Sequence, residues 1–167
     1  MTINKHELSL AVHQRPLPDK EIEAWVRPRR LHIVAATVGE DEHSVGLHEI
    51  LDIKHGGIEK YGFLCHDLGT SVTIEQLLDE AVENHACAIL VSTIVTHAHV
   101  HEENMRRLHE LATERGVRDR LLLLAGGTQV TDELARDCGM DGGFGRGTMG
   151  CEVASFLVRA LRQREVK

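Results

Sequence analysis

The feature that most constrains this sequence is a regular alternation of short apolar runs with segments of helical periodicity. The apolar runs cover residues 31–38, about 61–66, 86–91, about 120–125 and, more weakly, 142–144. The helical patterns follow them in turn, at about 46–55, 74–82, 100–115, 131–138 and 150–163. Strands that are apolar throughout are typical of a parallel sheet buried on both faces. Since crossovers between parallel strands are right-handed, the sequence predicts an α/β fold with a doubly wound five-stranded parallel sheet.

Length and composition indicate one domain preceded by an N-terminal arm. A chain of 167 residues is the usual size of a single domain. Residues 1–30 are polar and hold all three prolines, so we expect an extended arm there and the sheet domain at 31–167. Residues 21–26 could form one helical turn or pack on a partner. The only tryptophan, Trp25, either covers the sheet edge or contacts another subunit.

The overall charge and hydropathy exclude several classes of partner. A net charge of -7 argues against a nucleic-acid surface. No stretch of eighteen apolar residues is present, so we expect no membrane partner. The N-terminus lacks the apolar run of a signal peptide, and the cysteines form no C-x-x-C pair. We therefore expect a cytoplasmic location and reduced, mostly buried thiols.

In open parallel sheets, ligands bind beyond the carboxyl ends of the strands, near the point where the strand order reverses. Five loops reach that edge in the predicted fold, and they are rich in glycine, serine, threonine and histidine. These loops are 39–46, 67–71, 92–99, 126–131 and 144–149. Small residues and hydroxyl groups on several loops suit a long, narrow, partly apolar ligand such as a nucleotide tail.

The loop after the first strand carries a D-x-H-x-x-G pattern, formed by Asp41, His43 and Gly46. Asp41 can accept the proton of one imidazole nitrogen, which orients the ring and makes the other nitrogen a better metal ligand. Gly46 lets a bulky group approach the backbone. The pattern favours a large metal cofactor held by one axial histidine, although His43 could instead be a surface residue that caps the following helix.

Together with Ser92 after the third strand and Gly126-Gly127 after the fourth, this pattern resembles the flavodoxin-like cobalamin-binding domain of mutases and methionine synthase. The resemblance implies that His43 ligates cobalt, that Asp41 orients it and that the cofactor's nucleotide tail runs into the domain. The residues that it places around the cofactor are Asp41, Glu42, His43, Ser44, Val45, Gly46, Ser92, Thr93, Ile94, Val95, Thr96, Ala125, Gly126, Gly127, Thr128, Phe144, Gly145, Gly147, Thr148 and Met149.

The later runs 91–101, 116–120 and 142–147 look like the small subunit of lysine 5,6-aminomutase, and D-ornithine 4,5-aminomutase carries a similar domain. The resemblance covers about residues 29–163. It implies adenosylcobalamin as cofactor, a diamino acid as substrate, and pyridoxal phosphate held by a larger barrel subunit. It also implies that Lys54 is catalytic, through a Schiff base with pyridoxal phosphate. The plainer interpretation of Lys54 is an exposed lysine near a helix C-terminus.

Three departures from the family's pattern accompany the resemblance. The N-terminal region is shorter, the stretch between Lys54 and Leu68 is shorter, and Arg146 replaces the proline of the glycine-rich run after the last strand.

Two other functions compete with a subunit of an aminomutase. A stand-alone corrinoid carrier or a cobalamin-binding sensor would keep the cofactor site but give Lys54 no role. A flavodoxin-type domain without cobalamin would need a phosphate loop after the first strand, where the acidic stretch 40–42 is a poor anion site.

Overall fold

The molecule is built on a parallel sheet, as the sequence predicts. The computed structural model describes residues 15–37, 57–69, 72–92, 100–126, 130–145 and 149–165. The strands are β1 (His32–Thr37), β2 (Leu64–Asp67), β3 (Ala88–Ser92), β4 (Leu122–Gly126) and β5 (Gly142–Phe144). Their order in the sheet is β2-β1-β3-β4-β5, and every pairing is parallel. This is the doubly wound order in which the chain changes direction across the sheet between β1 and β3.

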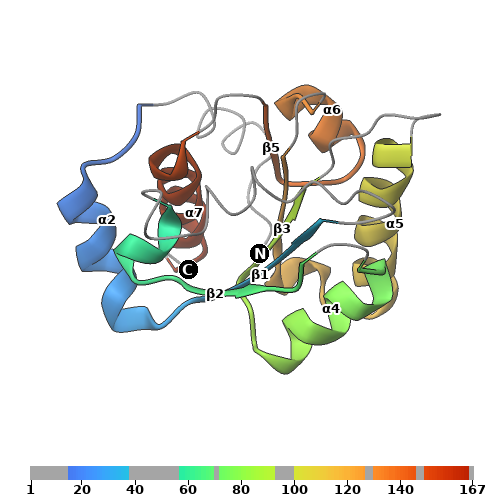
Figure 1. Ribbon diagram of the computed structural model, residues 1–167, viewed down its shortest axis with the longest axis horizontal. Coiled ribbons are helices and arrows are strands. Elements are labelled where there is room, and N and C mark those ends of the chain that lie inside the picture. Colours follow the sequence, from blue (N-terminus) through green and yellow to red (C-terminus); the bar gives the residue numbers. More distant parts are fainter. Residues whose placement is uncertain are drawn as a thin grey trace.

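Helices cover both faces of the sheet (Figure 1). They are α2 (Asp19–Val26), α4 (Ile74–Glu83), α5 (Val100–Glu114), α6 (Asp132–Asp137) and α7 (Gly150–Glu165), with 3-10 turns η1 (Arg27–Arg29), η3 (Ile58–Tyr61) and η5 (Arg118–Arg120). In Figure 1, α2 and α7 lie on one side of the sheet and α4 and α5 on the other. Within the described residues, no helix combines the length and the apolar character needed to cross a membrane.

Two cores follow from the alternation of side chains along each strand. On β1, Ile33 and Ala35 belong to the cluster that packs under α2 and α7, whereas Val34 and Ala36 belong to the cluster under α4, α5 and α6. A strand sends successive side chains to opposite faces, so one continuous apolar run supplies both layers. This is the physical reason why the strands lack the polar alternation of a half-exposed sheet.

The start of α4 shows how the local sequence sets an element boundary. The hydroxyl of Thr73 accepts from the backbone N–H of Gln76 at 3.1 Å, and the Gln76 side chain accepts from the Thr73 N–H at 3.0 Å. This reciprocal capping box satisfies two backbone donors that a helix start otherwise leaves unpaired. The apolar residues that follow at helical spacing are buried against the sheet, namely Ile74, Leu77, Leu78 and Ala81.

The predicted second strand begins too early. Residues Ile58–Tyr61 form η3, and β2 starts only at Leu64. Gly62 separates the two with φ of 106°, a left-handed conformation that glycine adopts without steric cost. Because η3 buries the Tyr61 ring in the core under α7, an aromatic residue that looks typical of a strand belongs to a turn.

The described part of the N-terminal arm is helical and packs on the domain. α2 has eight residues, more than the single turn expected, and its Ile22 and Val26 are fully buried. The backbone N–H of Leu17 donates to Ser155 Oγ of α7 at 2.8 Å. Trp25 is half-buried against the same core cluster. The division at residues 30 and 31 into arm and domain stays a prediction, as does a subunit contact through Trp25.

Candidate functional site at the carboxyl edge of the sheet

The carboxyl ends of four strands meet in one row. In the register of the sheet, Thr37 of β1 lies beside Ser92 of β3, Ser92 beside Gly126 of β4, and Gly126 beside Phe144 of β5. The pair Thr37 and Ser92 spans the point where the strand order reverses. A ligand that binds at the switch point of this sheet therefore meets two hydroxyl residues and a glycine.

This row faces the α7 side of the sheet. Paired residues of parallel strands share a face, and two positions before Thr37 lies Ala35, which is in the α7-side core. Phe144 confirms the direction, because its ring packs edge-on against Phe156 of α7 with centroids 5.7 Å apart and an interplanar angle of 82°. The aromatic pair forms one end of the row.

Two buried hydroxyl groups lie at the centre of the row. Thr37 has 0% and Ser92 8% of its surface exposed. Thr37 Oγ1 is buried and has no hydrogen-bond partner among the residues that the structure describes, although the Thr37 backbone N–H donates to the Gly69 carbonyl at 2.9 Å. Leaving a buried polar group unsatisfied costs about 1–3 kcal/mol. An unsatisfied donor on a well-fixed strand end suits a site that a polar ligand completes.

Gly126 adds no side chain to the row, and packing among the described residues does not require a glycine at this position. Among the described residues, a Cβ placed at Gly126 would meet only the Phe144 carbonyl oxygen, at an ordinary 3.5 Å. At Gly143, by contrast, a Cβ would lie 2.6 Å from the Thr131 carbonyl oxygen and 2.7 Å from Ala135 Cβ. The fold therefore needs Gly143 for the contact with α6. At Gly126 no described contact requires a glycine, so the missing side chain there leaves room for a ligand at the strand end.

Six of the residues predicted to surround a cofactor are described by the structure: Ser92, Ala125, Gly126, Phe144, Gly145 and Met149. The register brings three of these, Ser92, Gly126 and Phe144, side by side. Gly145 follows β5 directly. The Ala125 side chain is buried on the opposite face, in the core under α5, so only its backbone is near the row. Met149 is 64% exposed, and its backbone N–H donates to Glu152 of α7 at 2.9 Å.

The remaining predicted site residues lie outside the described part of the chain: Asp41, Glu42, His43, Ser44, Val45, Gly46, Lys54, Thr93, Ile94, Val95, Thr96, Gly127, Thr128, Gly147 and Thr148. Their roles stay predictions. Thr37 is a site candidate that sequence reasoning missed, because it closes an apolar run and was assigned to the strand. The one signal that could have found it is a hydroxyl residue four positions before Asp41.

The cysteines at the other end of the strands are poor nucleophiles. Burial, followed by nearby Glu59, raises the pKa of the Cys65 thiol to about 12, and burial likewise raises the pKa of Cys87 to about 12. At neutral pH both are thiols rather than the reactive thiolates. Across the ranges that the structure describes, no group of three or more His, Cys, Asp or Glu side chains could hold a metal ion.

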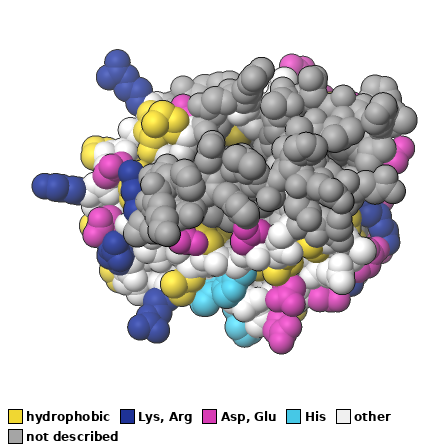
Figure 2. Space-filling view, viewed as in Figure 1, with side chains coloured by type: hydrophobic (Ala, Val, Ile, Leu, Met, Phe, Trp, Pro, Cys, Tyr) yellow, Lys and Arg dark blue, Asp and Glu magenta, His cyan; other side chains and the backbone are white. Residues whose placement is uncertain are grey.

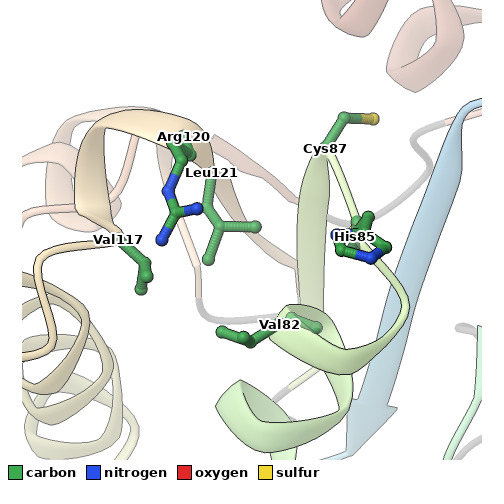
Figure 3. Close-up of a pocket in the computed structure, with 8 residues that line it drawn as sticks. Val82, His85, Cys87, Val117, Arg120 and Leu121 are labelled. Atoms are coloured by element: carbon green, nitrogen blue, oxygen red, sulfur yellow. The ribbon is translucent and has the colours of Figure 1, made fainter.

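A cavity of about 270 Å³ lies at the amino edge of the sheet (Figure 3). Cys87 and Leu121 line it and come directly before β3 and β4, respectively. Figure 3 shows Val82 and His85, which come from the end of α4 and the turn after it, on the same side as Cys87, with Val117, Arg120 and Leu121 across from them. Since ligands of such sheets bind beyond the carboxyl ends, this cavity is separate from the row at Thr37 and Ser92.

Three arginines precede β1, at positions 27, 29 and 30, and they do not form a patch of one sign. Arg27 Nε donates to Glu23 at 2.7 Å, and its guanidinium also donates to the Lys60 carbonyl. Lys60 in turn pairs with Asp19 at 3.4 Å. Figure 2 shows basic and acidic side chains side by side on this edge of the molecule, where Figure 1 places α2.

Comparison with known proteins shows the family to which the sheet domain belongs. The model of the B12 binding domain family matches residues 31–154, which include all five strands. The chain is 55% identical over 157 residues to the D-ornithine 4,5-aminomutase subunit beta of Acetoanaerobium sticklandii, covering 93% of this chain and 21% of that one. It is 36% identical to the lysine 5,6-aminomutase beta subunit of the same organism, covering 98% of this chain and 66% of the relative.

Among solved structures, a cobalamin-binding protein from Desulfitobacterium hafniense DCB-2 is similar, with a TM-score of 0.65 and 26% identity. The similarity covers 78% of this chain and 59% of that protein. The chain thus spans about a fifth of the first aminomutase relative and about two thirds of the second.

Proposed function

Because the chain belongs to the B12-binding domain family, we propose that it is the adenosylcobalamin-binding subunit of a pyridoxal-phosphate-dependent aminomutase. The proposed reaction moves an amino group between adjacent carbons of a diamino acid such as lysine, β-lysine or ornithine. The substrate class comes from the relatives, which are an ornithine and a lysine aminomutase subunit with 55% and 36% identity to this chain. The enzyme class is an isomerase, and this chain supplies its cobalamin-binding part.

The observation that carries the proposal is the row of Thr37, Ser92, Gly126 and Phe144 at the switch point. The unsatisfied hydroxyl of Thr37 and the missing side chain at Gly126 fit an elongated ligand with polar groups. The D-x-H-x-x-G pattern begins at Asp41, four residues after β1 ends at Thr37, and this short separation along the chain supports the proposal.

The proposed roles of the residues follow from their chemistry. His43 binds cobalt through one imidazole nitrogen, and Asp41 accepts the proton of the other nitrogen and thereby orients the ring. Ser92 and Gly126 border the nucleotide tail. The chemistry that the bound cofactor supplies is hydrogen-atom abstraction, started by homolysis of its cobalt–carbon bond.

Lys54 and a larger barrel subunit complete the proposal. The described part of this chain is a sheet domain, so we place pyridoxal phosphate and substrate on that partner subunit, as the resemblance to the aminomutases implies. Lys54 would hold pyridoxal phosphate through its primary amine, which condenses with the aldehyde of that cofactor and releases water.

The first test is retention of cobalamin. We expect the purified chain to keep near-stoichiometric cobalt after incubation with adenosylcobalamin and desalting, and His43→Ala to lose it. Electron paramagnetic resonance of the chain loaded with cob(II)alamin then tests the ligand directly. Labelling with ¹⁵N-histidine should change the nitrogen splitting from a triplet to a doublet. An unchanged splitting would show that no histidine ligates cobalt.

The second test separates the aminomutase from a stand-alone corrinoid carrier or sensor. Borohydride reduction of the assembly with the barrel-bearing partner should fix pyridoxal phosphate to Lys54 in the wild type and not in Lys54→Arg. Lys60→Arg is a matched control, because Lys60 lies in η3 and pairs with Asp19. Full aminomutase activity of Lys54→Arg would contradict the catalytic role of Lys54.

A further inference from the structure

We propose that Thr37 is a cofactor-binding residue whose hydroxyl hydrogen-bonds to a polar group of the nucleotide tail of cobalamin, beside Ser92. The inference rests on the proposed function and adds a residue that the D-x-H-x-x-G pattern does not include. It starts from Thr37 Oγ1, which is buried at the end of β1 and has no hydrogen-bond partner in the described part of the chain.

The position of Thr37 favours a ligand over a packing role. It is the last residue of β1, its backbone N–H is bonded to Gly69, and its register partner is Ser92. No hydrogen bond links the Ser92 hydroxyl to another residue in the part of the chain that the structure describes. Two hydroxyl groups thus lie on one face at the switch point, where ligands of such sheets bind.

Ser155 shows what a buried hydroxyl with a structural role looks like in this fold. It is also buried, but its Oγ donates to the Cys151 carbonyl at 2.6 Å and accepts from the Leu17 N–H at 2.8 Å. Both capacities of that hydroxyl are used within the chain. The Thr37 hydroxyl differs from this, since it is buried and makes no hydrogen bond within the described ranges of the chain.

The contrast predicts that removal of the Thr37 hydroxyl affects two quantities in opposite ways: the stability of the cobalamin-free protein and the affinity for cobalamin. In Thr37→Val, the shape is kept and the unsatisfied group is gone, so the cobalamin-free chain should be at least as stable as the wild type. Cobalamin affinity should fall about 5- to 30-fold, the loss expected for one buried hydrogen bond. Thr37→Ser keeps the hydroxyl and should bind within about threefold of the wild type.

The experiment uses the full chain and two readouts. Thermal unfolding of the cobalamin-free protein gives stability, and titration with adenosylcobalamin followed by visible absorbance gives affinity. Ser155→Ala is the control, for which we expect a lower unfolding temperature and unchanged affinity. Wild-type affinity in Thr37→Val would overturn the assignment, as would parallel losses of stability and affinity. A wild-type chain that binds no cobalamin would overturn the proposed function as well, so the two failures are distinguishable.

Discussion

The Tyr61 hydroxyl donates a hydrogen bond to Asp19 Oδ1 over 2.7 Å and so joins η3 to the first turn of α2. Tyr61 is 1% exposed, and its ring lies in the core under α7. The bond lowers the pKa of Asp19 below its ordinary value, with Tyr61 as the largest cause and Lys60 as a further one. Burial, with Asp19, raises the pKa of Tyr61 well above its usual range.

This bond should make stability depend on pH in a defined direction. A carboxyl group whose pKa is lowered by folding stabilises the protein above its unfolded pKa, and that contribution is lost as pH falls through the folded value. The difference in unfolding temperature between wild type and Tyr61→Phe should therefore be largest near neutral pH. It should shrink below pH 3.8, the ordinary pKa of the group. A difference that stays constant from neutral to acid pH would show that the ionised carboxylate is not its source.

The partly buried ion pair of Arg118 and Asp141 should contribute more to the free energy of unfolding than exposed ion pairs do. Their atoms lie 3.1 Å apart with side chains 16% and 15% exposed, and Asp141 also accepts from the Leu123 N–H at 2.8 Å. Asp141→Ala removes the counter-ion of a partly buried guanidinium and the acceptor of the Leu123 N–H, so we expect a loss of about 3 kcal/mol in chemical denaturation.

The control for that variant is the exposed pair of Arg107 and Glu75, whose side chains are about half exposed. Glu75→Ala should change the free energy of unfolding by at most about 1 kcal/mol. Equal effects of Asp141→Ala and Glu75→Ala would contradict the structural role of the Arg118 pair.

Two glycines should separate folding from binding. Gly143→Ala forces a methyl group against the Thr131 carbonyl and Ala135, and overpacking of this kind costs about 1–3 kcal/mol. Gly126→Ala meets only ordinary contacts and should unfold like the wild type, while its new methyl group lowers cobalamin retention. Thermal unfolding and cobalt content of the two desalted variants test this, and a destabilised Gly126→Ala with normal cobalt content would refute it.

The thiols of Cys65 and Cys87 should resist modification in the native protein. With a pKa of about 12 each, both are almost fully protonated at pH 8, and the thiolate is the form that reacts. Iodoacetamide labelling followed by peptide mass spectrometry should leave both cysteines unmodified until denaturant is added. Rapid labelling of either one in the native chain would show that its environment is more polar than the structure indicates.

The sequence predicted the sheet because a parallel sheet under two helical layers needs strands that are apolar on both faces. The runs around Ile33, Leu90 and Leu123 satisfy that need, and they form β1, β3 and β4. It misplaced the start of β2, since the aromatic Tyr61 is as compatible with a strand as with a buried 3-10 turn. Only the left-handed Gly62 and the packing under α7 decide between them.

For the site, the sequence predicted that Ser92, Gly126 and Phe144 end neighbouring strands, and the register places them in one row. Their contact with a cofactor stays a prediction. The sequence could not identify Thr37 as a site residue. Its full burial, and its lack of a hydrogen-bond partner among the described residues, arise only in the folded structure. A threonine at the end of an apolar run gives no sign of either.

Trp25 gives the molecule an optical reporter at the contact between α2 and α7. It is the only tryptophan, and the guanidinium carbons of Arg29 and of Arg162 of α7 lie 3.9 Å and 5.9 Å from its ring centroid. Its fluorescence therefore follows the attachment of α2 to α7 with no contribution from any other indole. An emission change when a partner chain is added would show whether assembly rearranges this corner of the domain, without any label being introduced.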